Sequence, residues 1–324
     1  MVNTLKRKEI IPSNKQLKVV MRNTVLVIAL IGLMANGCKS PISDSDPQED
    51  DQAFSNLFGS PQSVGTVAPT DLDEASGLGN SRSNDLYLWS HNDSGGDPVL
   101  FLLTQQGADS GRFELEGAQN IDWEDFAIGP GPDDALTYLY AADIGDNNAR
   151  RESLTIYRVP EPDLNIEDIP ATSTLTNVEA IEFVYEDGAR DAETLMVDPA
   201  TKDLYIVTKR ESSVILYALP YPQNLVEPDT ARRVLVLPFT FATGGDISAN
   251  GNEVLIKNYQ NVYHWAKTGN ETIAELLANE PNRLVYTAEP QGEGIGWKSD
   301  GSGYFTLSEI DNSDAAIIYS YNKN

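Results

Sequence analysis

Apolar residues in this chain occur in short runs separated by turns, and one arrangement of these runs recurs. The stretch "DAETLMVDPATKDLYIVTKRE", residues 191–211, starts with acids, continues as an apolar run, turns, and continues as a second apolar run. Runs of this length bounded by Asp, Pro and Lys predict two β-strands joined as a hairpin. One residue is unexpected, because Glu193 heads a strand that should be buried, where an unpaired carboxylate is costly.

The same unit of acid, apolar strand, turn, apolar strand and polar end occurs five times along the chain. A third apolar run follows most units, and a more polar fourth run follows that. Four short strands at intervals of roughly 45–50 residues are typical of β-propeller blades. Helical periodicity is nearly absent, with "NETIAELLA" as one short candidate. The acids that open the units are Glu74, Glu124, Glu193, Asp246 and Glu293.

These patterns predict an all-β fold, a β-propeller of five four-stranded blades. The last unit lacks a fourth strand, and "SVGTVAP", which precedes the first unit, has no blade of its own. We expect this N-terminal strand to complete the last blade and close the ring, which removes exposed strand edges. The second unit contains "EPDLNIEDIPATSTLTN", which we interpret as a loop insertion. If the insertion contains strands, the ring has six blades instead.

The chain is strongly acidic, with 49 Asp and Glu, 23 Lys and Arg, and a formal net charge of −26. Nucleic acid is not an expected partner, because neutralising phosphates requires clustered Lys and Arg. The composition suits an extracytoplasmic surface or a protein that collects cations. The single cysteine excludes disulfides within the chain.

The N-terminus has the pattern of a secretory signal. Basic residues precede the apolar run "TVLVIALIGLMANG", which leads to the sole cysteine, Cys38. The run is too short for a convincing transmembrane span. The small residues before Cys38 resemble a bacterial lipobox, although Asn36 stands where a smaller residue is usual. The resemblance implies that Cys38 is lipidated; a plain signal peptide is the alternative, and Met21 is an alternative start.

The sequence therefore divides into three expected parts. Residues 1–38 form a lipoprotein-type signal, and residues 39–62 form a disordered acidic tether rich in Ser, Asp and Pro. Residues 63–324 form the propeller domain. We expect a monomer that is anchored through its lipid to the membrane of the bacterial cell envelope, on the extracytoplasmic side.

In a propeller the first strand of each blade lines the central channel, and the second strand runs back beside it. The five opening acids should therefore converge on one mouth of the channel, where the ends of the second strands join them. Like charges raise one another's pKa, so a counter-charge is needed. Ca²⁺, which takes about six to eight oxygen ligands, is the expected cofactor. The alternative is that each acid accepts backbone N–H bonds between neighbouring blades.

Other residues near the predicted mouth are candidates for other roles. His91, at the end of a second strand, is a candidate general base or ligand. We expect Lys209, Arg210 and Arg150 to hold a small anionic substrate. Asp122 and Asp191, which adjoin two of the opening acids, are interpreted as turn or packing residues, and His264 as a structural residue. Two histidines in the whole chain give little support to a Ser–His–Asp triad.

Two units, "DAETLMVDPATKDLYIVTKRE" and "QGEGIGWKSDGSGYFTLSEI", resemble the blade units of secreted calcium-dependent propellers. These families include the β-propeller phytases and the esterase-like, phytase-related proteins; gluconolactonase-type propellers are more distantly similar. In them an acid that opens each inner strand lines the channel, and in phytases such acids bind the Ca²⁺ that holds a phosphate substrate. The full phosphate-binding set of Lys, Arg and Tyr in phytases has no residue-by-residue match here.

The first functional hypothesis is a Ca²⁺-dependent hydrolase of phosphoesters or small esters. In this hypothesis Glu193, Glu293 and His91 carry the chemistry, while a bound ion bridges protein carboxylates and substrate oxygens. The second hypothesis is a non-catalytic binding propeller that recognises a surface glycan or a partner protein. The scarcity of histidine favours the second, and a convergent set of bases beside a metal would favour the first.

Overall fold

The structure is a computed structural model, and it describes residues 53–164, 167, 169–310 and 315–324. The predicted signal, with Cys38, and residues 39–52 of the predicted tether lie outside the described residues.

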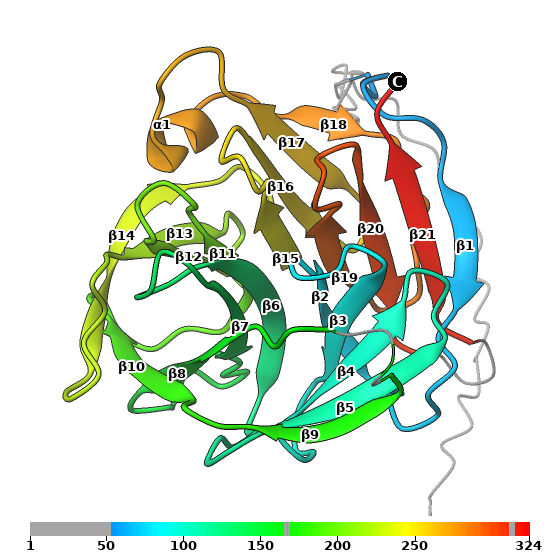
Figure 1. Cartoon of the computed structure of the whole chain (residues 1–324). Helices are drawn as coiled ribbons and strands as arrows, with labels where there is room; N and C mark the ends of the chain where they lie inside the picture. The colour runs from blue at the N-terminus through cyan, green and yellow to red at the C-terminus, as the bar shows by residue number, and fades with distance from the viewer. Residues whose placement is uncertain (1–52, 165–166, 168, 311–314) are drawn as a thin grey trace, which may run out of the picture. The chain divides into compact units, whose positions relative to one another are not determined.

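The strands form five four-stranded antiparallel blades arranged around one axis, so the predicted five-bladed propeller is confirmed (Figure 1). The first blade consists of β2 (Ala75–Asn80), β3 (Tyr87–Asn92), β4 (Val99–Thr104) and β5 (Asp109–Leu115). The second blade consists of β6 (Trp123–Pro130), β7 (Thr137–Asp143), β8 (Leu154–Pro160) and β10 (Glu179–Tyr185). The third blade consists of β11 (Ala192–Val197), β12 (Leu204–Thr208), β13 (Ile215–Leu219) and β14 (Asp229–Val236). The last two are formed by β15 (Ala242–Ile247), β16 (Glu253–Asn258), β17 (Val262–Ala266) and β18 (Asn282–Leu284), and by β19 (Gly292–Trp297), β20 (Gly303–Ser308), β21 (Ile317–Asn322) and β1 (Gln62–Thr66).

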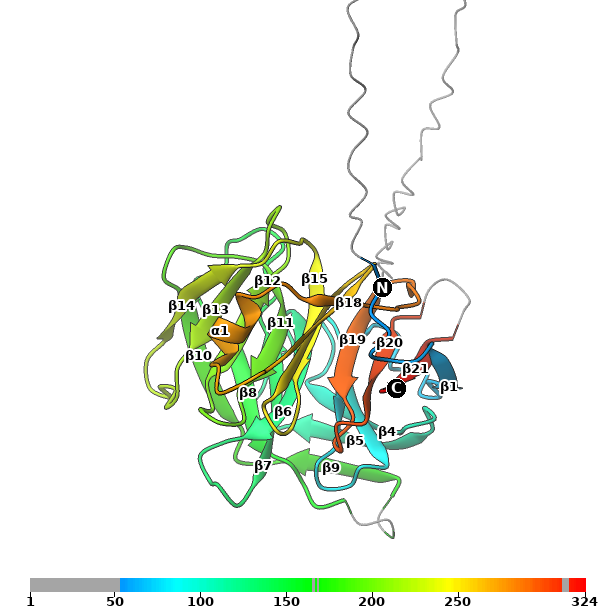
Figure 2. The same ribbon diagram turned by 90° about the horizontal axis from the view of Figure 1, so that it is seen from above.

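The first strands of the blades, β2, β6, β11, β15 and β19, pack side by side around the axis (Figure 1). Figure 2 shows β6, β11, β15 and β19 from a direction at right angles to that view. They are buried on both faces, unlike the outer strands, and small residues let them approach one another closely. At Gly296, for example, a Cβ atom would lie 2.6 Å from the backbone oxygen of Leu78 in the neighbouring inner strand. The glycines of the units are therefore a requirement of the ring itself.

A buried carboxylate ties three blades together inside the ring. The Oδ2 atom of Asp125 in β6 accepts hydrogen bonds from the backbone N–H groups of Leu195 at 2.9 Å and Gly245 at 3.2 Å. These donors belong to β11 and β15. Burial raises the pKa of Asp125 well above its usual value, although these two N–H groups and that of Phe126, which donates to Oδ1 at 2.8 Å, act in the opposite direction.

The ring closes as the sequence predicts, through pairing of its two ends. β1 pairs antiparallel with β21, with Gln62 opposite Ser320, and completes the fifth blade. The chain is already part of the domain before β1, however. The N–H of Ser55 donates to the Arg283 oxygen at 2.7 Å, and the Phe58 side chain is buried. The predicted domain start at residue 63 is thus too late, because this segment contributes to the core.

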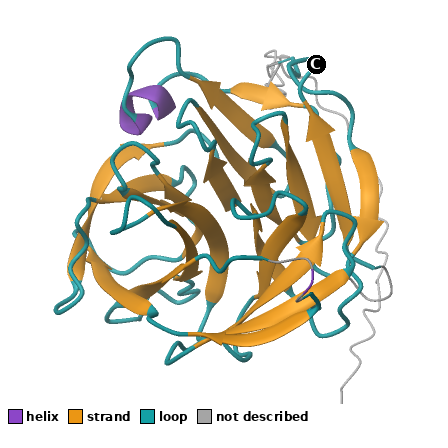
Figure 3. Ribbon diagram, viewed as in Figure 1, coloured by secondary structure: helices purple, strands orange, loops and turns teal. Residues whose placement is uncertain are grey.

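The insertion in the second unit does not create a sixth blade. Its strand β9 (Ala171–Leu175) pairs in parallel with β5 and extends the first blade at its outer edge. A second parallel pairing, between β10 and β14, joins the outer edges of the second and third blades. Strands make up almost all of the regular structure (Figure 3).

One short α-helix interrupts this pattern. It is α1 (Ile273–Leu277), which begins with a capping box between Thr272 and Glu275, as the candidate "NETIAELLA" predicts. Among the described residues no helix has the length and apolar character needed to cross a bilayer.

Phe58 should contribute much of the stability that the N-terminal segment provides. Its ring lies 5.1 Å from that of Tyr304 and 6.0 Å from that of Trp297 between centroids. Phe58→Ala should lower the free energy of unfolding by about 3–5 kcal/mol, measured by denaturant titration. The exposed neighbour is the control, and Leu57→Ala should cost less than about 1 kcal/mol. Equal effects of the two variants would contradict the docking of this segment.

Candidate metal centre at the channel mouth

Each inner strand carries a β-bulge close to its start, at one end of the channel. Pairing with the second strand of the blade skips one residue in β6, β11, β15 and β19, and two residues in β2. A bulge leaves a residue unpaired and re-aims its side chain, so the skipped residues are equivalent positions around the axis. We call them the bulge ring: Ser76, Glu124, Glu193, Thr243 and Glu293.

Two further sets of residues surround the bulge ring at the same mouth. The first set stands two residues before the bulge ring, and the second follows the end of each second strand. The backbone joins them: the Lys209 N–H, for example, donates to the Asp191 oxygen at 3.0 Å. The first set is Glu74, Asp122, Asp191, Phe241 and Gln291, and the second is Asp93, Gly145, Lys209, Tyr259 and Glu309.

Two groups of three carboxylates at this mouth have the spacing of metal ligands. Asp93, Asp122 and Glu124 each offer one oxygen within 4.8 Å of the other two, and so do Glu124, Asp191 and Glu193. Glu124 belongs to both groups, so its carboxylate can serve either position. We call these groups the two triads; in each, two carboxylates stand two residues apart and the third comes from a neighbouring blade.

Three observations fit the triads to a hard cation. All their donors are carboxylate oxygens, which Ca²⁺ and Mg²⁺ prefer. Glu193 Oε2 is buried and has no hydrogen-bond partner among the described residues, so one ligand atom is available. Gly145 of the second blade leaves the space beside Glu124 free of a side chain. A Cβ atom at this position would lie 2.2 Å from Glu124 Oε1 and 2.5 Å from Asp122 Oδ2.

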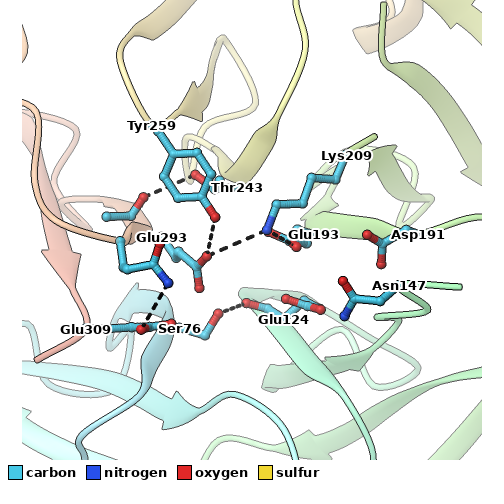
Figure 4. Close-up of polar contacts among 12 residues, drawn as sticks. Ser76, Glu124, Asn147, Asp191, Glu193, Lys209, Thr243, Tyr259, Glu293 and Glu309 are labelled. Carbon is cyan, nitrogen blue, oxygen red and sulfur yellow. Dashed lines mark hydrogen bonds and ion pairs between the residues drawn. The ribbon is translucent and has the colours of Figure 1, made fainter. Parts of the chain in front are cut away.

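Lys209 supplies the charge that holds part of the bulge ring together. Its ammonium contacts Glu193 Oε1 and lies 3.8 Å from Glu293 Oε1, and it stands 5.3 Å from the centre of the Tyr259 ring (Figure 4). The Tyr259 hydroxyl donates to the same Glu293 oxygen at 2.9 Å. Burial would lower the pKa of Lys209, but Glu193 and Glu293 outweigh it and raise that pKa. Contact with a carboxylate favours the ammonium over the neutral amine, so Lys209 is charged.

The carboxylates on the opposite side of the mouth have less compensation. Burial and the charges of Glu293 and Asp122 raise the pKa of Asp93 to about 7. Burial and Glu293 likewise raise the pKa of Glu309 to about 7. Burial, Glu193 and Asp93 raise the pKa of Glu124 well above its usual value. The mouth therefore holds more negative charge than its own cations neutralise.

The fourth blade makes this charge distribution asymmetric. Its bulge residue is Thr243, and the Lys257 ammonium lies buried beside it, donating to the Gly292 oxygen. Burial lowers the pKa of Lys257 to about 8, which still leaves it largely protonated at neutral pH. Lys257 thus adds positive charge between the fourth and fifth blades. Both triads lie on the first three blades, of which the third also carries Lys209.

The five opening acids predicted from the sequence do not all meet. Glu124, Glu193 and Glu293 belong to the bulge ring. Glu74 is exposed and stands two residues before the bulge ring, where its backbone N–H donates to the Asn92 Oδ1 atom at 3.2 Å. Asp246 is not at this mouth: it is the fifth residue of β15, and its Oδ2 accepts from the Trp297 N–H at 2.8 Å. For Asp246 the alternative of an acceptor between blades is the better description.

The other residues predicted for the site also lie in different surroundings. The His91 ring is fully buried between Trp123 and Phe126, so it cannot meet a substrate at the mouth, and burial lowers its pKa to about 4. Arg210 pairs with Asp191 at the edge of the mouth. Arg150 is exposed in the loop after β7, while its neighbour Arg151 pairs with Asp143 at 2.6 Å.

Sequence reasoning missed three of the five triad residues. Asp93 was not among the expected ligands, and Asp122 and Asp191 were interpreted as turn or packing residues. Both stand two positions before a bulge-ring glutamate, and this shared offset was the available signal. Asp191 also has a structural role, because its Oδ1 atom accepts a hydrogen bond from the Asp146 N–H at 2.8 Å. The two functions are compatible, since a carboxylate has more than one acceptor position.

A cavity lies beside the mouth, next to Glu309. Its volume is about 300 Å³, which is within the range of small-ligand sites. Its walls include Pro290, Ile317 and Tyr319, so they are largely apolar, and Glu309 joins the cavity to the mouth.

No protein-family model and no curated protein matches the sequence. Among solved structures, the β-propeller domain of Cps50 (Swd1) from Myceliophteria thermophila is similar to the chain, with a TM-score of 0.42 and 10% identity over 80% of this chain and 99% of that one. A chain of a nidogen/laminin complex has a TM-score of 0.43 and 10% identity over 72% of each chain. Nothing about a ligand or an activity of this chain follows from either likeness.

Proposed function

We propose that the acidic channel mouth binds a divalent cation, Ca²⁺ in the first place, and that the protein is a metal-dependent hydrolase of phosphoesters or small esters. The observation that carries the proposal is the sharing of Glu124 between two triads, together with the unpartnered Oε2 of Glu193. The ligands would be Asp93, Asp122, Glu124, Asp191 and Glu193. Of the ligands expected from the sequence, this set keeps Glu124 and Glu193. Glu74, Asp246 and Glu293 are replaced by Asp93, Asp122 and Asp191.

A bound divalent ion would polarise a substrate oxygen and lower the pKa of a bound water. The residues of the chain then have separate tasks. Glu293 is outside both triads and near Lys209, so it is the candidate acceptor for the proton of an attacking water. Lys209 is the ammonium at the mouth that would orient an anionic substrate group, and Tyr259 positions Glu293.

The cavity beside Glu309 favours a small ester over a highly charged phosphoester. Its apolar walls give an acyl or alkyl group a place next to the mouth, while the surrounding carboxylates repel a polyanion. A substrate with one ester bond and a short apolar body therefore fits this side of the mouth best.

A second candidate is a non-catalytic propeller that uses a bound ion to recognise a surface glycan or a partner protein. Two observations favour it: His91 is buried, and Lys209 is already held by Glu193. In this case the ion would take hydroxyl or carboxylate oxygens of the ligand, and Glu293 would be a hydrogen-bond acceptor only.

Calcium should stabilise the protein through Glu124. An ion that binds only the folded state stabilises it by about 2.7 kcal/mol at a hundredfold excess over Kd. For a domain of this size we expect the melting temperature to rise by roughly 4–10 °C on Ca²⁺ addition after chelator treatment. Glu124→Gln should remove most of this rise in a thermal melt, because it weakens both triads.

The matched control is Glu293→Gln, a change of the same kind at a buried bulge-ring position outside both triads. It should keep most of the Ca²⁺ response. If the two variants respond alike, or if the wild type responds to no divalent ion, the carboxylates have only structural roles.

Hydrolysis should require the same ion as the stabilisation does. Unlike the stabilisation, it should require both Glu124 and Glu293. With p-nitrophenyl acetate, p-nitrophenyl butyrate and p-nitrophenyl phosphate as substrates, release of p-nitrophenol should require Ca²⁺ and stop in chelator. Glu293→Gln should lower kcat by about a hundredfold or more while Ca²⁺ still binds, since a general base contributes roughly that much. Calcium binding without turnover of any ester would leave the binding propeller as the function.

We also propose that Cys38 carries a lipid that anchors the protein to the outside of a membrane of the bacterial envelope. The sole cysteine directly follows small residues and an apolar run. Cys38→Ala should move the protein from the membrane fraction to the soluble fraction, as detected by immunoblotting. Retention of the variant in membranes would show that the apolar run itself is the anchor.

A further inference from the structure

A second cavity lies at the opposite end of the channel. Its volume is about 350 Å³. The inner strands contribute their last residues to it: Ile128, Val197 and Ile247 come from the ends of β6, β11 and β15. The metal centre lies at the starts of the same strands, so the two sites are on opposite ends of the ring. Seven of the twelve lining residues are apolar, Pro130, Leu136 and Pro199 among them, and the polar ones include Arg82, Asp134 and Ser248.

Arg82 lines this cavity and forms no ion pair among the described residues, although the chain has more than twice as many acids as bases. Within the described part of the chain its guanidinium makes one hydrogen bond, a long one of 3.4 Å to the Ser299 oxygen. A guanidinium has five N–H donors, so most of them are available. The side chain is half-buried, which limits its access to water.

The neighbouring carboxylates are engaged elsewhere. Asp246 is the buried acid whose pKa responds to Arg82, but its Oδ2 already accepts the Trp297 N–H at 2.8 Å. Asp134 also lines the cavity, and it is paired with Lys202 at the surface. The guanidinium of Arg82 is therefore a charged group in the cavity wall that has no carboxylate in direct contact.

The loop that carries Arg82 is held in place by a buried network. The Glu161 carboxylate accepts hydrogen bonds from the Ser81 hydroxyl at 2.6 Å, the Trp89 indole at 3.0 Å and the Arg82 N–H at 3.2 Å. Next to it, the Asn80 side chain accepts the Ser299 N–H at 2.8 Å. The backbone beneath the guanidinium is thus fixed before any ligand arrives, which lowers the entropic cost of binding.

We propose that this cavity binds a small amphiphilic carboxylate, with its anionic head on Arg82 and its short apolar body between Ile128, Val197 and Ile247. Arginine binds carboxylates through paired N–H donors, and the apolar walls favour a hydrocarbon body over a sugar or a polyanion. The site is independent of the divalent cation at the other end of the channel.

Calorimetric titration of the full chain with sodium hexanoate tests the proposal. Hexanol and hexylamine are the comparison ligands, because they have a six-carbon chain but no carboxylate. Hexanoate should bind in the millimolar range or tighter, and at least about tenfold more tightly than hexanol or hexylamine. Arg82→Met, which keeps the length of the side chain, should lose about tenfold or more in hexanoate affinity. Arg82→Lys should retain part of the affinity.

The matched control is Lys202→Met, which removes a nearby cation that is already paired with Asp134. It should bind hexanoate like the wild type. If Arg82→Met does not fold, Ala249→Trp replaces it, because it fills the cavity from an exposed position and should abolish binding. Absence of hexanoate binding, equal binding of hexanol, or equal losses in Arg82→Met and Lys202→Met would overturn the proposal. Chelator should leave hexanoate binding unchanged.

Discussion

Five inner strands that pack around one axis bring their first residues together, and in this protein many of those residues are acids. The bulge ring exists because each inner strand loses its pairing register at the same place, and the bulge turns a side chain inward. The fold thus places like charges at one mouth before any ligand is considered. Lys209 compensates Glu193, and Lys257 lies beneath the fourth blade. Neither lies among the oxygens of Asp93, Asp122 and Glu124.

This distribution of charge explains why a cation site is expected on one side only. Thr243 replaces an acid in the fourth blade, and a buried ammonium stands next to it, so a divalent ion would be repelled there. At the triads, burial first and then the charges of neighbouring carboxylates raise the pKa of Asp93 and of Glu124, and a cation would relieve the repulsion among these carboxylates. The stability of the ring and the affinity of the mouth are therefore linked through the same carboxylates.

Much of the fold could be predicted from the sequence, because the repeated pattern of short apolar runs needs only the period of a blade. The same pattern placed β1 in the fifth blade, since two incomplete ends of one ring must pair. Register was harder to predict. In the first and fourth blades the bulge residues are Ser76 and Thr243, so a search for acids selected Glu74 and Asp246 instead. Glu74 and Asp246 stand two and three residues from these bulge positions, and in a strand a slip of one residue already moves a side chain to the other face.

The sequence offset of Asp122 and Asp191 recurs in the units, but the convergence of the triad oxygens depends on loop geometry that this pattern does not contain. Asp122 and Asp191 precede strands, and Asp93 follows one, so their positions are set by the bends of the connecting backbone. The burial of His91 was also beyond the pattern, because it requires the packing of Trp123 from the next blade. Residues that alternate within strands were readily located, while residues at strand ends required the three-dimensional structure.

The most direct test of the metal centre is a crystal structure grown with a lanthanide ion in place of Ca²⁺, examined by anomalous scattering. Lanthanides prefer the same oxygen ligands and give strong anomalous peaks. We expect a peak within bonding distance of Glu124 and of either Asp93 and Asp122 or Asp191 and Glu193, or peaks at both positions. A map with no peak at Glu124, or with peaks only at exposed surface carboxylates, would contradict a cation site at the mouth.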